Sequence, residues 1–243
     1  MNEVAVVTGA SGGIGAAICE ALRADQWTVV GLDRAPSGTV LEADITCPEA
    51  LEKALSRVEA DIGPIGAMVA CAGAIEAPQQ DPLSVPLDEW ERVVNVNLRG
   101  TYLSCLAAAR KMSPRQRGAI VTIGSLAALC SMPLHAYGPA KAAVVSMTEN
   151  LAAAWGRQGI RVNCVCPGPT RTPFIEASYA RGERDPATME SMTALGRLVK
   201  PEEVAHAVRF LCSDGASAMT GSTVLVDAGV RCRQLWALFD VAH

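Results

Sequence analysis

The sequence predicts an α/β fold in which a doubly wound parallel sheet of about seven strands is covered by helices. Short apolar runs rich in β-branched residues alternate with longer amphipathic segments along almost the whole chain. The runs are nearly continuously apolar, which is typical of strands buried on both faces of a parallel sheet. A glycine-rich stretch follows the first run and opens the first helical pattern. Together these observations indicate a Rossmann-like domain.

The elements follow in order from these patterns. We expect strands at residues 3–8, 27–32, 39–44, 66–70, 119–124, 160–166 and 222–227. Apolar residues recur with helical spacing at residues 14–25, 48–61, 87–112, 141–155 and 201–212. The stretch between Arg34 and the third strand is too short for a helix, so this crossover is abbreviated. Repeats, low-complexity stretches and linkers are lacking, so residues 1–243 are expected to form a single domain.

Two segments stand outside this alternation. The polar connection over residues 170–198 is long for a compact domain, and such segments are usually lids or binding loops. It carries the apolar residues Phe174, Ile175, Tyr179, Met189, Met192 and Leu195. The C-terminal tail, residues 230–243, holds an apolar cluster of Leu235, Trp236, Leu238 and Phe239. We expect this cluster to pack on a neighbouring subunit, or alternatively on the core of its own chain.

Composition excludes several partners. The formal net charge of -4 comes without a basic tract, so neither nucleic acid nor an anionic membrane is an expected partner, and a small-molecule ligand fits better. No apolar run is long enough to span a bilayer, and Met1 leads into Glu3, Val4 and Val6 rather than a signal sequence. We therefore expect a cytoplasmic protein. Nine scattered cysteines indicate reduced thiols, and three distant histidines predict no metal site.

The stretch TGASGGIG, residues 8–15, predicts dinucleotide binding. Gly9, Gly13 and Gly15 allow a tight turn, close approach of a pyrophosphate and packing of the helix on the strand. The N–H groups at the start of the helix are available to phosphates. Glycines also serve ordinary turns, but here a strand and a helix flank them as the motif requires.

Asp33 ends the second expected strand and bears on the choice between NAD and NADP. A carboxylate there can accept hydrogen bonds from both ribose hydroxyls of NAD and would repel the 2′-phosphate of NADP. Arg34 could instead hold that phosphate, although Gly12 supplies no second cation in the loop. The alternative is that Asp33 and Arg34 form a solvated strand end.

A candidate catalytic group lies around Tyr137. Lys141 follows four residues later, so on a helix its ammonium shares a face with the tyrosine and favours the phenolate, which makes a usable acid/base. Ser125 follows an expected strand, at the end of the sheet where ligands bind, and can donate a hydrogen bond to a substrate oxygen. Asn97 lies inside a long helix. Taken singly, these residues could be a packed aromatic, a helix cap and a helix kink.

The motifs TGASGGIG, NVNLRG, IGS, YGPAK and CPGPTRTP, in this order, resemble the short-chain dehydrogenase/reductase family from Val4 to Gly229. The resemblance implies that Tyr137 is the general acid/base and that Lys141 modifies its pKa and binds ribose. It also implies that Ser125 positions the carbonyl or hydroxyl group, and that Asn97 holds a proton-relay water.

Asp33 favours NAD as the cofactor, and the resemblance further implies which residues bind it. Asp44 and Ile45 would flank the adenine, and Thr172 would bind the nicotinamide amide. The implied cofactor-binding set is Gly9, Ser11, Gly12, Gly13, Ile14, Gly15, Asp33, Asp44, Ile45, Ala72, Gly73, Tyr137, Lys141, Pro167, Gly168, Thr170 and Thr172. The chain departs from the family at residues 70–73, which read Ala-Cys-Ala-Gly where Asn-Asn-Ala-Gly is usual, so the bracing amides are missing.

The function expected from these features is NAD-dependent transfer of a hydride between nicotinamide and a secondary alcohol or ketone. The abbreviated crossover and the run RQRGAIVTIGSLAA look like 2,3-dihydro-2,3-dihydroxybenzoate dehydrogenases, whose substrates are cyclic diols. One alternative is an NADPH-dependent ketoreductase of the 3-oxoacyl-carrier-protein reductase kind. Another is a dinucleotide-sensing protein without turnover.

Other residues bear on the substrate and on the oligomeric state. Leu126, Leu129 and His135 would form the wall of the site opposite the lid. Arg171 could grip a substrate carboxylate in bidentate fashion, or pair with a lid carboxylate such as Glu176. The two long helices carry apolar residues on more than one face, which predicts a homodimer or homotetramer, as is usual in the family.

Overall fold

A computed structural model describes residues 3–36, 38–78, 81–233 and 236. Within these residues seven strands form one parallel sheet in the order β3-β2-β1-β4-β5-β6-β7. The strands are β1 (Val4–Thr8), β2 (Thr28–Asp33), β3 (Leu41–Glu42), β4 (Ile65–Ala70), β5 (Gly118–Ile123), β6 (Ile160–Pro167) and β7 (Thr223–Val226). The predicted fold class is confirmed.

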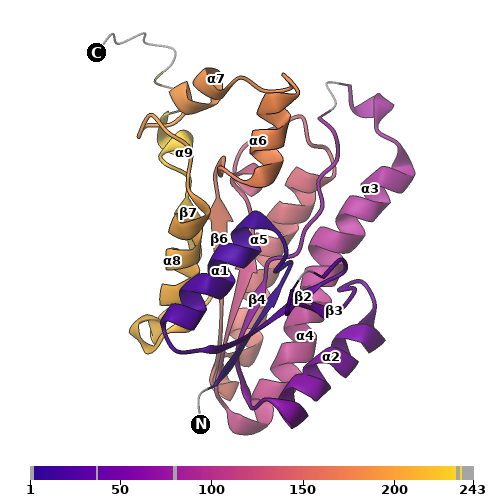
Figure 1. Cartoon of the computed structure of the whole chain (residues 1–243), viewed down its shortest axis with the longest axis vertical. Helices are drawn as coiled ribbons and strands as arrows, with labels where there is room; N and C mark the ends of the chain where they lie inside the picture. Colours follow the sequence, from indigo (N-terminus) through magenta and orange to yellow (C-terminus); the bar gives the residue numbers. More distant parts are fainter. Residues whose placement is uncertain (1–2, 37, 79–80, 234–235, 237–243) are drawn as a thin grey trace.

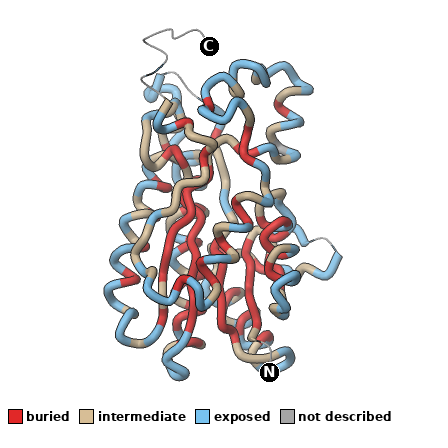
Figure 2. Tube along the Cα trace, turned by 90° about the vertical axis from the view of Figure 1, so that its left-hand side faces the viewer, coloured by how far each residue is buried: buried red, intermediate tan, exposed pale blue. Residues whose placement is uncertain are grey.

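Helices cover both faces of the sheet (Figure 1). On one face lie α1 (Gly13–Ala24) and α8 (Pro201–Cys212); on the other lie α2 (Pro48–Asp61), α4 (Thr101–Met112) and α5 (Tyr137–Trp155). Successive residues of β1 point into different cores, since Val4 and Val6 pack with the second group of helices and Ala5 and Val7 with the first. Burial on both sides explains why the strands lack an alternating polar pattern, and Figure 2 shows buried residues following them through the molecule.

The long helix predicted over residues 87–112 is interrupted. It consists of α3 (Leu87–Val94), a π-helical turn (Asn95–Gly100) and α4. The turn is buried at Asn97, whose side-chain Nδ2 donates to the carbonyl oxygen of Val93 at 2.9 Å. The side chain thus takes up a carbonyl at the point where the regular hydrogen-bond ladder is broken.

Other boundaries differ less. The third strand is shorter than predicted, and β2 leads into it without a helix, as the short crossover requires. Helix α5 begins at Tyr137, ahead of the apolar pattern from which it was predicted. Single 3₁₀ turns lie at Pro82–Ser84, Ser113–Arg115, Leu126–Ala128, Gly156–Gln158 and Asp214–Ala216. None of the helices within the described ranges has the length and apolar character needed to cross a membrane.

The remaining helices gather beyond the carboxyl ends of the strands, at the top of Figure 1. The connection over residues 170–198 contains α6 (Pro173–Ala180) and α7 (Pro186–Ser191), and α9 (Val230–Arg233) follows the last strand. In the tail, Leu235, Leu238 and Phe239 lie outside the described residues, and Trp236 is 60% exposed. The predicted packing of that cluster therefore stays a prediction.

Candidate active site

The strand order reverses between β1 and β4, and open α/β sheets bind ligands at such a switch point. Thr8 ends β1, and its hydroxyl oxygen accepts hydrogen bonds from the backbone N–H groups of Cys71, at 3.1 Å, and Ala72, at 3.2 Å. Residues 70–73 carry no amide side chains, and this hydroxyl joins the end of β1 to the main chain after β4.

The glycine loop is shaped by contacts that leave no room for side chains. Gly9 has a φ of +69°, and a Cβ there would lie 2.7 Å from the Cα of Ala72. A Cβ on Gly15 would lie 2.1 Å from the carbonyl oxygen of Gly9. Gly12 precedes α1 without a side-chain hydrogen bond from any described residue to the first turn. The first-turn N–H groups, among them that of Ile14, are therefore available to an anion.

Asp33 lies beside this loop at the end of β2. Its Oδ2 accepts a hydrogen bond from the backbone N–H of Ser11 at 3.1 Å, and its Oδ1 accepts one from Ala35 at 3.1 Å. Two backbone donors therefore hold the carboxylate at the mouth of the loop, while Arg34 next to it is exposed. The structure therefore brings Asp33 beside the glycine loop, and the two hydrogen bonds explain why its carboxylate has one orientation.

Asp44 and Ile45, the residues predicted to flank adenine, are buried to different extents. Hydrogen bonds from the backbone N–H and hydroxyl of Thr46 hold the pKa of Asp44 below its usual range. Ile45 is buried, and a Cβ on Gly100 would lie 2.6 Å from its Cδ1. The isoleucine side chain thus packs under the π-helical turn, so a ligand at this point would meet Asp44 or the backbone of Ile45.

Lys141 and Tyr137 meet at the start of α5. The Lys141 side chain is 3% exposed, and its Nζ donates to the carbonyl oxygen of Ile123, the last residue of β5, at 2.7 Å. The same Nζ lies 5.6 Å from the centre of the Tyr137 ring. The lysine is therefore fixed by the sheet, with its positive charge facing the phenol.

Ser125 follows β5 and precedes the turn Leu126–Ala128. Its Oγ accepts a hydrogen bond from the backbone N–H of Ala127 at 3.1 Å, so it is indeed a cap, but its own proton stays available to a ligand. A Cβ on Gly138 would lie 3.3 Å from the carbonyl oxygen of Ala127. This contact brings the serine turn against the first turn of α5, next to Tyr137.

Asn97 joins the same group. Its Nδ2 donates to the carbonyl oxygen of Ala74 at 2.6 Å, and its Oδ1 accepts from the N–H of Ala74 at 3.4 Å. A Cβ on Gly73 would lie 2.8 Å from Oδ1 of Asn97 and 3.7 Å from Nζ of Lys141. Both amide protons of the side chain are used by backbone, so a relay water could bind only at the remaining acceptor capacity of Oδ1 or at the main chain.

Beyond β6 the chain returns to the glycine loop. Pro167 is buried at the end of β6, and the N–H of Gly168 donates to the carbonyl oxygen of Val226 at 2.9 Å. Thr170 donates its hydroxyl to the carbonyl oxygen of Gly168 at 2.9 Å. Thr172 caps α6, and a Cβ on Gly13 would lie 3.3 Å from the Cβ of Thr172. The start of α6 therefore lies directly against the loop that opens α1.

The segment over α6 and α7 has its own charge network. Nε of Arg171 lies 2.8 Å from a carboxylate oxygen of Glu176 on α6, and its Nη2 lies 4.0 Å from Glu190 on α7. Desolvation raises the pKa of Tyr179, whose hydroxyl lies 3.5 Å from the sulfur of Met189. Of the apolar residues predicted to line the lid, Met192 and Leu195 are exposed. The side chain of Phe174 is not among those that the structure describes.

Sequence reasoning missed two features, a pair of thiols on β6 and a buried carboxylate after β4. Cys164 and Cys166 on β6 face the same side with their sulfurs 3.8 Å apart, and their mutual hydrogen bond lowers the pKa of Cys164 and raises that of Cys166. Glu76 is a buried carboxylate that accepts hydrogen bonds from the N–H groups of Ala136 and Tyr137. A single acid within the small apolar stretch after β4 was the signal that could have identified it.

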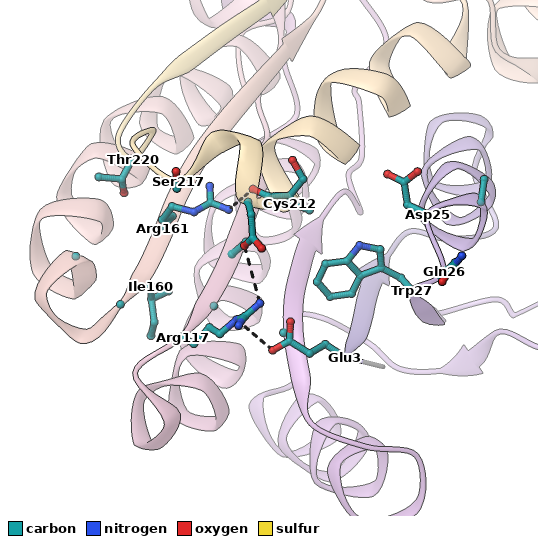
Figure 3. A pocket seen from close by; sticks show the side chains of 18 residues that line it. Glu3, Asp25, Gln26, Trp27, Arg117, Ile160, Arg161, Cys212, Ser217 and Thr220 are labelled. Carbon is teal, nitrogen blue, oxygen red and sulfur yellow. Dashed lines mark hydrogen bonds and ion pairs between the residues drawn. The ribbon is translucent and has the colours of Figure 1, made fainter. Parts of the chain in front are cut away.

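A cavity of about 830 Å³ lies at the amino ends of β4, β5 and β6, away from these residues (Figure 3). Its Arg161 donates to the carbonyl oxygens of Leu211 at 2.8 Å and Ser213 at 3.1 Å, at the end of α8, and burial lowers the pKa of this guanidinium. Arg117 lies 3.4 Å from Glu3 in the same cavity. Arg161 and Arg117 therefore hold the fold together, and none of the predicted site residues lines this cavity.

Comparison with known proteins gives consistent matches. The family model described as enoyl-(acyl carrier protein) reductase matches residues 9–231. An uncharacterized short-chain type dehydrogenase/reductase of Sinorhizobium fredii is 36% identical over 94% of this chain, which spans only 43% of that protein. Galactitol 2-dehydrogenase of Rhizobium johnstonii is 38% identical, with 95% of this chain and 96% of that protein covered. Cis-4-hydroxycyclohexanecarboxylate dehydrogenase of Sinomonas cyclohexanicum is 35% identical, with 94% and 96% covered.

Solved structures agree on the fold. A protein of Brucella melitensis described as ribose-5-phosphate isomerase is 39% identical and superposes with a TM-score of 0.92, covering 98% of this chain and 96% of that chain. A short-chain type dehydrogenase/reductase of Mycobacterium marinum is 30% identical with a TM-score of 0.87, covering 95% and 96%. The seven-stranded architecture therefore recurs over almost the full length of both relatives.

Proposed function

Because the chain belongs to the short-chain dehydrogenase/reductase family, we propose that it oxidises a secondary alcohol, or reduces the corresponding ketone, with NAD(H). The relatives that it resembles include dehydrogenases named for alcohol substrates. The observation that carries the proposal is the buried ammonium of Lys141, which the carbonyl of Ile123 holds facing the Tyr137 ring. A buried lysine without a carboxylate partner is expensive to maintain, so its position indicates a chemical task.

The residues around the glycine loop fit a dinucleotide. Side chains are excluded at Gly9, Gly13 and Gly15 where phosphates would approach, and the first turn of α1 offers uncapped N–H groups. Asp33 would hold the adenosine ribose, and Gly73, Gly168, Thr170 and Thr172 would line the path to the nicotinamide. When bound, nicotinamide supplies the acceptor or donor of a hydride at the substrate carbon.

The protein's own part in the reaction is proton transfer at the substrate oxygen. In the oxidation, the Tyr137 phenolate accepts the proton of the substrate hydroxyl, while Ser125 donates a hydrogen bond to the same oxygen. The Lys141 ammonium, which is buried and faces the ring, would stabilise the phenolate charge. In the reduction, Tyr137 returns the proton to the oxygen.

The substrate we propose is a neutral secondary alcohol on a polyol chain or a ring. Arg171 is the cation that could have gripped an anionic substrate, but Glu176 and Glu190 already occupy its guanidinium. Galactitol is a neutral polyol, and its dehydrogenase is one of the relatives at the higher identities. A cyclic diol also satisfies this description. The substrates of dihydro-dihydroxybenzoate dehydrogenases are cyclic diols that carry a carboxylate, and Arg171 would not be free to bind that group.

Cofactor preference should follow Asp33. We expect NAD to be preferred over NADP, because the carboxylate that Ser11 and Ala35 hold beside the glycine loop would repel a 2′-phosphate on the ribose. Asp33→Ala should narrow the preference, measured as the ratio of kcat/KM for the two cofactors, and Arg34→Ala in the same background should remove the remaining attraction for the phosphate. Equal kcat/KM values for both cofactors in the unmodified protein would contradict this proposal.

Removal of one hydroxyl should abolish turnover. Tyr137→Phe is expected to lower kcat by about 10²-fold or more, the scale of general acid/base catalysis, with NADH binding nearly intact. Lys141→Ala should weaken both turnover and NADH binding, because the ammonium serves the phenolate and the ribose. Tyr102→Phe on α4 is the matched control and should keep its activity. A Tyr137→Phe protein with most of its activity would exclude the mechanism.

A variant of Arg171 tests whether the substrate is neutral or anionic. Since it pairs within the lid, Arg171→Ala should change KM for 4-hydroxycyclohexanecarboxylate and for its methyl ester by the same factor, within about threefold. Arg181→Ala is the control, because that arginine pairs with Glu183 in the same segment. A KM for the acid that rises at least about tenfold more than that for the ester would show that Arg171 binds the carboxylate.

We also propose a dimer or tetramer. Leu87, Trp90 and Tyr102 on α3 and α4 are 77%, 38% and 42% exposed, an apolar surface that assembly would cover. Light scattering on the whole chain should give a multiple of the monomer mass, and Leu87→Glu should reduce it. Deleting residues 234–243 tests the tail: an unchanged mass would mean that the tail has no part in assembly.

A further inference from the structure

The feature that the proposed mechanism leaves unused is the carboxylate of Glu76. It lies in the segment after β4, is 4% exposed, and is neither a strand nor a helix residue. Its Oε1 accepts hydrogen bonds from the backbone N–H of Ala136 at 2.7 Å and of Tyr137 at 3.0 Å. Its Oε2 lies 3.2 Å from the same Tyr137 nitrogen. A buried acid therefore bonds the main chain of the proposed catalytic tyrosine itself.

These bonds complete the first turn of α5. A helix start has N–H groups without partners inside the helix, and Ala136, the residue before α5, supplies no side-chain cap. The N–H of Gly138 donates to the carbonyl oxygen of Leu134 at 3.1 Å, and Pro139 has no N–H. The two donors left over are those of Ala136 and Tyr137, and Glu76 accepts from both. The cap comes from a segment remote in the sequence, so it also ties the loop after β4 to α5.

A carboxylate suits this position electrostatically. The start of a helix carries partial positive charge, and hydrogen bonds to an ionised acceptor are stronger than neutral ones. The charge of Glu76 contributes to the raised pKa of Arg92 on α3, although the larger cause is the bond of Arg92 with Glu89. Arg92 also donates to the carbonyl oxygen of Ile75 at 3.3 Å, and Trp90 donates to that of His135 at 3.3 Å. Helix α3 thus holds the residue before Glu76 and the loop before Tyr137.

The two members of the Tyr137–Lys141 pair are held by different parts of the sheet. Lys141 is anchored to β5 through the carbonyl of Ile123, whereas the backbone of Tyr137 is anchored to the loop after β4 through Glu76. The separation of 5.6 Å between Nζ and the ring centre depends on both anchors. We expect loss of the Glu76 anchor to move the phenol relative to the ammonium, which keeps its own bond to Ile123.

We propose that Glu76 is the positioning residue of Tyr137, and that its Oε1 sets the place of the phenol hydroxyl relative to Ser125 and Lys141. The consequence for turnover rests on the proposed function. Misplacement of a reacting group by about 1 Å can cost about 10²-fold in rate. The effect should fall on kcat, because Glu76 contacts neither the glycine loop nor Asp33 in the described structure.

The test compares Glu76→Ala with Glu76→Gln, which keeps an acceptor at the place of Oε1. The matched control is Glu203→Ala, which removes a carboxylate that caps α8 and pairs with Arg197, away from Tyr137.

The first readout needs no substrate. The chain has three tyrosines, so labelling with ¹³Cζ-tyrosine gives three signals, which Tyr→Phe variants assign. We expect the Tyr137 signal to move in Glu76→Ala alone, with those of Tyr102 and Tyr179 unchanged.

The second readout is kinetic, with an alcohol that the unmodified protein oxidises. Glu76→Ala should lower kcat by about 10- to 100-fold, with KM and the Kd for NADH within about threefold. Glu76→Gln and Glu203→Ala should keep kcat within about threefold. If Glu76→Ala does not fold, Glu76→Asp replaces it: its shorter carboxylate should shift the Tyr137 signal and lower kcat.

An unmoved Tyr137 signal in folded Glu76→Ala or Glu76→Asp would overturn the proposal. So would a Glu76→Gln protein as impaired as Glu76→Ala, because the charge rather than the acceptor at Oε1 would then be responsible. Failure of the proposed function looks different. In that case the unmodified protein oxidises no alcohol with NAD or NADP, while the Tyr137 signal still responds to Glu76→Ala, and the positioning inference stands.

Discussion

The close approach of the loops after β1 and β4 is the constraint on which the rest of the site depends. Gly9 lies so near Ala72 that a Cβ on the glycine would be 2.7 Å from the Cα of Ala72. The hydroxyl of Thr8 accepts hydrogen bonds from the main chain after β4 and so joins the two strand ends. One loop then leads into α1, whose first turn can receive phosphates, and the other leads past Gly73 to Glu76. Both halves of the site therefore start from one contact at the switch point of the sheet.

Lys141 on α5 and Glu76, which bonds the N–H groups at the start of α5, are buried side chains of opposite charge. Each would be destabilising alone, and each is satisfied in its own way: Lys141 by a carbonyl at the end of β5, and Glu76 by the free N–H groups of the helix. Neither uses the other as its hydrogen-bond partner. The ammonium therefore faces the Tyr137 ring, and no carboxylate among the described residues is hydrogen-bonded to it, as the proposed role of Tyr137 as a base requires.

In the segment that contains α6 and α7, ion pairing changes the role that we assign to Arg171. Arg171 lies one residue from Thr172, close to where the nicotinamide would sit, and a sequence pattern cannot separate a substrate-binding arginine from one that pairs with its own chain. In the structure its guanidinium joins α6 to α7 through Glu176 and Glu190. These two ion pairs link the two short helices above the site to each other through one side chain.

The sequence by itself determined the sheet, most helix positions, the glycine loop and the pairing of Tyr137 with Lys141. These features depend on local rules: apolar periodicity, glycine where backbones approach, and a helical spacing of four residues. Only the tertiary structure decided the π-helical turn at Asn97, the side-chain packing of Ile45 under Gly100 and the cap of α5 by Glu76. These depend on partners far apart in the chain, whereas the thiols of Cys164 and Cys166 share one side because residues two apart on a strand face the same way. Which partner a buried polar group finds is settled only when the strands take their order, because burial makes an unsatisfied group too costly to keep.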